Sequence, residues 1–164
     1  MSTELDMRQR TIASSGVEAS ADAGVGAATT ASSPRARVVF TIARIVLGLL
    51  FAVMGLNGFV LFLPPPPMSA IPHNAAVFSG AMFASHYMYL TSGAQVLAGV
   101  LLLLNRYVPF ALVVLAAMLV NILTFHITMW PQTLFPLPLL AVVLWFLACW
   151  PLRHHFALLF RARV

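Results

Sequence analysis

Polar but uncharged side chains recur at helical spacing in two long apolar stretches of this chain. Thr91, Ser92 and Gln95 share one stripe on the first stretch, and Asn121 and Thr124 share one on the second. Burying an amide in apolar surroundings is unfavourable unless it finds a hydrogen-bond partner. We therefore expect the two stripes to face each other or a shared cavity. There they either hydrogen-bond the carbonyl groups of a small apolar ligand or bond across the helix interface.

The histidines of the same region suggest a second kind of site. His126 lies about 140° around the predicted helix from Asn121, so it faces a different neighbour. Folding the two stretches back on each other brings it level with His86. Such a pair could ligate haem or a metal, and a single imidazole could carry protons because it titrates near neutrality. The alternative is an interfacial histidine bonded to backbone or lipid headgroups. Asn57 could line the same pocket as His126 or cap its own helix.

Four apolar runs must position these side chains. Residues 85–130 contain two of them, separated by Asn105-Arg106-Tyr107, and each run approaches the ~20 residues that cross a bilayer as a helix. This pattern predicts a transmembrane hairpin with Arg106 at its tip. The other two crossings are predicted at about 38–63 and about 134–152.

The composition excludes an ordinary soluble domain, because 61% of the 164 residues are hydrophobic and only 8% are charged. The arginines stand beside the ends of the apolar runs and form no patch with interleaved aromatic residues, so nucleic-acid binding is not expected. Cytoplasmic loops of membrane proteins are enriched in arginine. This rule places both termini and the hairpin tip in the cytoplasm, on the basis of Arg35, Arg37, Arg44, Arg106, Arg153, Arg161 and Arg163.

The segments outside the four runs have signatures of their own. Residues 1–34 are rich in Ala, Ser, Gly and Thr, which predicts a disordered cytoplasmic tail and not a signal peptide. The four prolines at 64–67 must end the first helix. Residues 74–84 are too few to span a bilayer and predict a helix on its outer face, whereas residues 154–164 predict an interfacial tail on the cytoplasmic side. The transmembrane domain is assigned to residues 35–153.

Three segments resemble the DoxX family of small bacterial membrane proteins, a group that includes the DoxD-like subunits of thiosulfate:quinone oxidoreductase. They are residues 43–59 (ARIVLGLLFAVMGLNGF), 95–106 (QVLAGVLLLLNR) and 121–126 (NILTFH). The resemblance implies a four-helix bundle in the bacterial cytoplasmic membrane that acts beside redox proteins, in quinone-linked or thiol and oxidative-stress systems. Where many relatives carry a glutamate this chain has Gln95, and where many carry a lysine it has Gly58. A proton relay through those positions is therefore not expected.

We accordingly predict an all-α integral membrane protein, a four-helix bundle that binds a quinone or another small hydrophobic molecule in its outward half and serves a redox partner. The sequence indicates no redox centre of its own, so enzyme and accessory subunit both remain open. A non-enzymatic scaffold or small-solute carrier is the alternative. Gly48, Ala52 and Gly55 suit close packing within the chain or in a homo-oligomer. The candidate ligand-binding residues are Asn57, Thr91, Gln95, Asn121, Thr124 and His126, and the candidate metal ligands are His86 and His126.

Overall fold

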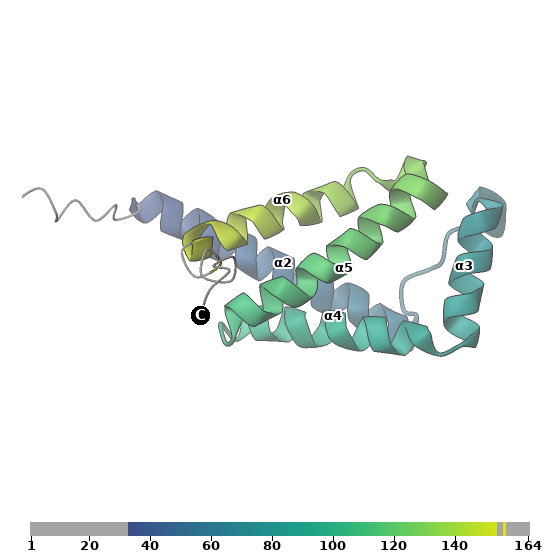
Figure 1. Ribbon diagram of the computed structural model, residues 1–164, viewed down its shortest axis with the longest axis horizontal. Helices are drawn as coiled ribbons and strands as arrows, with labels where there is room; N and C mark the ends of the chain where they lie inside the picture. Colours follow the sequence, from purple (N-terminus) through teal and green to yellow (C-terminus); the bar gives the residue numbers. More distant parts are fainter. Residues whose placement is uncertain (1–32, 154–155, 157–164) are drawn as a thin grey trace, which may run out of the picture. The chain divides into compact units, whose positions relative to one another are not determined.

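The regular structure is entirely helical in the computed structural model, which describes residues 33–153 and Phe156. The all-α prediction is confirmed for this part of the chain. The predicted tails, residues 1–34 and 154–164, lie outside the described residues apart from Ser33, Pro34 and Phe156. Figure 1 shows the helices in their order along the chain.

Helix α2 (Pro34–Val60) occupies the first predicted run. It begins earlier than expected because the missing N–H of a proline needs no partner in the first turn of a helix. It ends at Val60, before the prolines at 64–67 as predicted, and Pro67 has an extended backbone with φ −59° and ψ 138°. The Leu63 N–H donates to Asn57 Oδ1 at 2.8 Å. Asn57 thus ties the departing chain to the last turns of α2.

Helix α3 (His73–Ala84) confirms the predicted short helix at residues 74–84. It starts directly after Pro72 and stands across one end of the longer helices (Figure 1). The Phe78 ring lies 5.8 Å from the Phe125 ring of a later helix, α5 (Val108–Met129), measured between ring centroids. The location of α3 on a membrane face stays a prediction.

Helices α4 (Tyr87–Leu103) and α5 confirm that the chain folds back on itself as a hairpin near Arg106. Asn105 takes a left-handed φ of 55°, a conformation that asparagine adopts more readily than most residues. The Arg106 N–H donates to the Leu101 carbonyl oxygen at 3.0 Å, and the Asn105 N–H donates to that of Leu102 at 3.2 Å. These two bonds are the Schellman pattern that ends many helices. The turn follows from local sequence.

Helix α6 (Leu137–Cys149) continues as a 3₁₀ turn (Trp150–Leu152) and fills the fourth predicted run. Pro138 lies in its first turn, where proline is tolerated. The Trp145 Nε1–H donates to the Leu112 carbonyl oxygen of α5 at 2.8 Å. This bond joins α5 to α6 in a way that the sequence did not predict.

Glycines allow α2 and α4 to pack with their backbones almost in contact. A Cβ atom added to Gly99 would lie 2.7 Å from the Ala52 nitrogen, and one added to Gly55 would lie 2.8 Å from the Ser92 carbonyl oxygen. At Gly58 an added Cβ would overlap Ser92 Oγ. The close approach expected of the small residues in α2 is therefore found, and the neighbour is α4.

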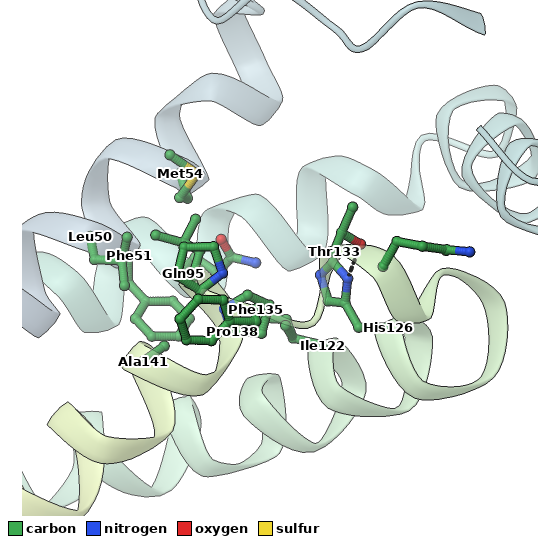
Figure 2. A pocket seen from close by; sticks show the side chains of 13 residues that line it. Leu50, Phe51, Met54, Gln95, Ile122, His126, Thr133, Phe135, Pro138 and Ala141 are labelled. Atoms are coloured by element: carbon green, nitrogen blue, oxygen red, sulfur yellow. Dashed lines mark hydrogen bonds between the residues drawn. The ribbon is translucent and has the colours of Figure 1, made fainter. Parts of the chain in front are cut away.

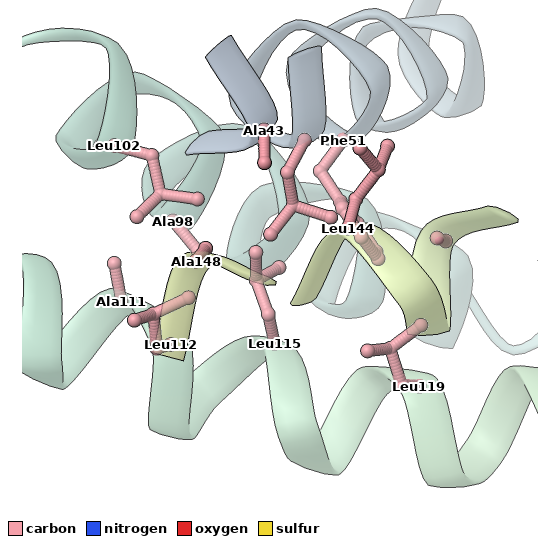
Figure 3. Close-up of a cluster of buried hydrophobic side chains, with 12 residues drawn as sticks. Ala43, Phe51, Ala98, Leu102, Ala111, Leu112, Leu115, Leu119, Leu144 and Ala148 are labelled. Carbon is pink, nitrogen blue, oxygen red and sulfur yellow. The ribbon is translucent and has the colours of Figure 1, made fainter. Parts of the chain in front are cut away.

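A single apolar core lies between the four long helices (Figure 3). Its fully buried leucines come from α2, α4 and α5, and α6 adds Leu144 and two alanines. Burial of such side chains is the main source of stability for packed helices. The fully buried leucines are Leu47, Leu102, Leu112 and Leu115.

The outward surfaces of these helices are also apolar. Val60, Leu97 and Val143 are 64%, 55% and 55% exposed. In the described part of the chain, α2 and α5 are long and apolar enough to cross a membrane, whereas the apolar stretches Tyr87–Leu103 and Leu137–Leu152 are shorter. Membrane association is weakly supported by this finding. The number of crossings and their orientation stay predictions.

Candidate functional site

A partly open cavity of about 520 Å³ lies between α2, α4, α5 and the beginning of α6 (Figure 2). Its walls are mostly apolar, with Leu50, Phe51 and Met54 from α2 and Ile122 from α5. The connection from α5 to α6 and the first turn of α6 close one side. The volume is in the range typical of small-molecule sites, which join apolar walls to a few polar groups.

Gln95 is one of the polar groups of this cavity. Its side chain is half-buried on α4 and makes no hydrogen bond to any residue that the structure describes. A carboxamide has both donors and an acceptor. Gln95 can therefore donate to a carbonyl group or accept from a hydroxyl group of a molecule held there.

His126 brings an imidazole to the same cavity from α5 (Figure 2). Its Nδ1 lies 2.7 Å from Thr133 Oγ1, and the Thr133 hydroxyl donates to the Trp130 carbonyl oxygen at 2.9 Å. Because a hydroxyl has only one hydrogen to donate, this arrangement favours a proton on Nδ1. In the neutral ring, Nε2 is then the acceptor.

Thr133 was not among the predicted site residues. Its hydroxyl reaches back three residues to Trp130, a local pattern common for threonine in turns. Thr133 belongs to the site because it lines the cavity and lies within hydrogen-bond distance of His126, and the two residues meet only once α5 and the following turn have folded. Sequence spacing alone therefore could not identify this contact.

The expectation that the stripes of α4 and α5 face each other or a shared cavity is wrong, because Gln95 lines the cavity and the α5 stripe does not. Asn121 is exposed and does not line the cavity, where α5 instead presents Ile122 and His126. The Thr124 hydroxyl donates to the Val120 carbonyl oxygen at 2.8 Å. Helix α5 is rotated in this way because burial of its leucines determines which face packs inward. Those leucines are Leu112, Leu115 and Leu119.

Two polar residues of α4 also lie outside the cavity. The Thr91 hydroxyl donates to the Met88 carbonyl oxygen of its own helix at 2.9 Å. Ser92 is buried against Gly58 at the contact with α2. Packing within the chain accounts for both. Whether any of the predicted residues binds a ligand stays a prediction.

Asn57 and His86 are also placed away from the cavity. Asn57 makes the local bond to Leu63 described above, which is the capping alternative. His86 is exposed at the start of α4, with its ring centroid 5.7 Å from that of Tyr89. Within residues 33–153 and Phe156, no three His, Cys, Asp or Glu side chains gather as metal ligands. A two-histidine metal site at His86 and His126 stays a prediction.

Comparison with protein-family models, with curated proteins and with solved structures finds no match to the chain. The resemblance to the DoxX family thus remains an expectation drawn from three segments. The case for a function rests on the cavity, whose polar lining residues include Gln132 and Thr133 as well as the two that the sequence predicted, Gln95 and His126.

Proposed function

We propose that the chain spans the bacterial cytoplasmic membrane four times, with both termini and the Arg106 turn in the cytoplasm. The contacts of Gly48 with Gly99 and of Gly55 with Ser92 make α2 antiparallel to α4. Trp145, late in α6, bonds to Leu112, early in α5, while a short connection joins the other ends of these two helices, so α6 is antiparallel to α5. The start of α2, the Arg106 turn and the end of α6 then share one end. Arginines concentrate at that end, as the positive-inside rule requires: Arg35, Arg37, Arg44, Arg106 and Arg153.

Helix length and aromatic residues support the same placement. The 17 residues of α4 extend over ~26 Å, slightly less than the ~30 Å of a bilayer core. Near its other end, Tyr89 stacks on Phe59 of α2 with ring centroids 5.6 Å apart, and Tyr87 is exposed. Tyrosines are enriched at the membrane–water interface. Local thinning of the bilayer accommodates the shorter helices.

The cavity is proposed to bind a quinone or another small apolar molecule that carries carbonyl or hydroxyl groups. The observation that carries this proposal is the presence of Gln95 and His126 in one otherwise largely apolar cavity. The carboxamide of Gln95 would donate to a carbonyl oxygen, and Nε2 of neutral His126 would accept from a hydroxyl. A quinone presents carbonyl groups when oxidised and hydroxyl groups when reduced. Electrons would pass to or from a redox partner, as the DoxX resemblance implies.

Binding of a short-chain ubiquinone analogue to the purified full chain tests this proposal. Gln95→Leu and His126→Leu each remove one hydrogen bond, so we expect the affinity to fall about 3- to 10-fold. Thr91→Val is the matched control, because Thr91 is one turn from Gln95 and its hydroxyl bonds to its own helix. No binding by the unaltered chain, or equal binding by all variants, contradicts the proposal. Native mass spectrometry would identify a different bound molecule.

A membrane scaffold or small-solute carrier is the second candidate function. The observation that favours it is that the polar groups of Thr91, Ser92 and Thr124 serve packing or bond to their own helices. A scaffold would keep its fold and its partner after Gln95→Leu, with no bound small molecule to lose. A partner that still copurifies with the Gln95→Leu variant, from a chain that never held a small molecule, would favour the scaffold or carrier.

A further inference from the structure

Asn121 is a polar side chain on the outer surface of α5. It is exposed, and it makes no hydrogen bond to any part of the chain that the structure describes. Counted along α5 (Val108–Met129), it lies ~20 Å from the first residue and ~12 Å from the last. If α5 crosses the bilayer as proposed above, the carboxamide of Asn121 lies within the hydrocarbon. An amide at that depth is unfavourable unless another group hydrogen-bonds it.

The neighbours of Asn121 on this face form a regular seam. Ala117, Asn121, Thr124 and Thr128 are all exposed and follow one another at intervals of four, three and four residues, the spacing of a helix–helix seam. The Thr124 and Thr128 hydroxyls donate to the carbonyl oxygens of Val120 and Thr124 at 2.8 and 2.7 Å. Asn121 is thus the polar side chain of the seam whose hydrogen bonds are unmet within the described residues.

The seam lies on the face of α5 opposite the leucines that pack into the core. Helix α3 contacts α5 beside the seam, through Phe78 and Phe125, and leaves Asn121 exposed. The side chains of Ala117 and Thr124 are small, so another helix could approach closely. The face is therefore open to a partner within the membrane and is not covered by the described part of this chain.

We propose that this seam docks on the same seam of a second copy of the chain, with Asn121 hydrogen-bonded to Asn121 of the other copy. Copies inserted in the same orientation are related by a two-fold axis along the bilayer normal, so identical residues meet at identical depth. A carboxamide both donates and accepts, which makes it complementary to itself. Any other occupant would need a matching polar group at this one depth. The inference rests on the proposed membrane crossing of α5.

Cysteine cross-linking of the full chain in membranes tests the contact. In a Cys149→Ala background, Ala117→Cys places a thiol on the seam, and a pair of such thiols across a close two-fold contact is near enough to form a disulfide. Leu97→Cys is the matched control, because Leu97 is 55% exposed at a similar height on α4. We expect oxidation to give a species of twice the chain mass for Ala117→Cys alone. Equal cross-linking at both positions, no cross-linking, or cross-linking to a different polypeptide overturns the proposal.

The contribution of Asn121 is measured separately, as the monomer–dimer equilibrium in lipid vesicles. Asn121→Leu should raise the dissociation constant about 3- to 20-fold, in line with hydrogen bonds measured between membrane helices. Asn121→Gln keeps the amide and should restore most of the loss. If Asn121→Leu dimerises as well as the unaltered chain, Asn121 does not hold the contact.

Failure of this inference can be told apart from failure of the proposed function. Resistance of the chain to alkaline extraction from membranes reports the crossing and does not depend on dimerisation. Binding of the ubiquinone analogue reports the cavity, and Gln95→Leu should reduce it without changing cross-linking through Ala117→Cys. A membrane-embedded, ligand-binding monomer would overturn the dimer alone.

Discussion

At the scale of the residue, the candidate site depends on the hydrogen bond between His126 and Thr133. The 2.7 Å contact fixes the imidazole of His126 at the cavity and determines which nitrogen is turned toward Thr133. A histidine that is held in one orientation loses less freedom when it binds a ligand than one that rotates. Thr133 is therefore a positioning residue for the proposed ligand contact.

Thr133→Val should weaken ligand binding without unfolding the protein. Valine has nearly the shape of threonine but lacks the hydroxyl, so His126 would lose the partner of its Nδ1–H. We expect the affinity for the ubiquinone analogue to fall about 3- to 10-fold, the value of one hydrogen bond. Titration of the purified variant measures this loss. An unchanged affinity would mean that His126 needs no orienting partner or does not touch the ligand, and Thr91→Val serves again as the control.

At the scale of the element, two kinds of contact hold the helices in register. Glycines bring α2 and α4 into backbone contact, as at Gly99 and Ala52, while Trp145 of α6 is bonded to a carbonyl group in the middle portion of α5. The glycine contact leaves no room for a side chain, so a larger residue there should destabilise the protein by overpacking. The Trp145 contact is one hydrogen bond, so a residue without the N–H should destabilise it by the loss of that bond.

Gly99→Ala should destabilise the protein by about 1–3 kcal/mol, the usual effect of overpacking a tight contact. The added methyl group would meet the backbone of α2 at Ala52, and neither helix could yield without moving the other. Gly80→Ala in α3 is the control, since nothing lies within 4 Å of the added Cβ. This control should be neutral or stabilising by about 0.5–1 kcal/mol, because alanine favours helices over glycine. Thermal unfolding in detergent compares the two, and equal melting temperatures would contradict the tight packing.

Trp145→Phe should weaken the packing of α6 against α5 and so lower the stability of the protein. Phenylalanine keeps an aromatic ring but has no N–H for the Leu112 carbonyl oxygen, so we expect a loss of about 0.5–1.5 kcal/mol from the hydrogen bond. Trp150→Phe is the matched control because Trp150 is 59% exposed. Unfolding in detergent should show the loss for Trp145 alone. A similar shift for both variants would indicate that ring size and not the bond is responsible.

At the scale of the whole molecule, the four proposed crossings would place the two ends of α5 on opposite sides of the membrane. Asn105, in the turn between α4 and α5, should face the cytoplasm, whereas Gln132, between α5 and α6, should face outward. Both side chains are exposed, so a thiol at either position can be reached from water.

In a Cys149→Ala background, Gln132→Cys should react with a membrane-impermeant maleimide added to intact cells, and Asn105→Cys should react only after permeabilisation. The expectation follows because one helix, α5, separates the two positions. Labelling is measured as a mass shift on gels. Reaction of both variants in intact cells, or of neither, would be incompatible with a crossing by α5, and the reverse pattern would invert the proposed orientation.

The positions of the helices were determined by sequence alone, because the patterns that specify them are local. Long apolar runs, the prolines at 64–67 and the Asn105-Arg106 turn each act within a few residues, and the structure places α2 to α6 accordingly. The sequence also identified Gln95 and His126 as candidates. What the tertiary structure alone decided is the rotation of α5, which takes Asn121 to the outer surface and brings His126 to the cavity with Thr133. A helix that is apolar on nearly every side has little amphipathic pattern to fix its rotation. The close packing of its leucines against the other helices fixes it instead, and that packing exists only once all of them have come together.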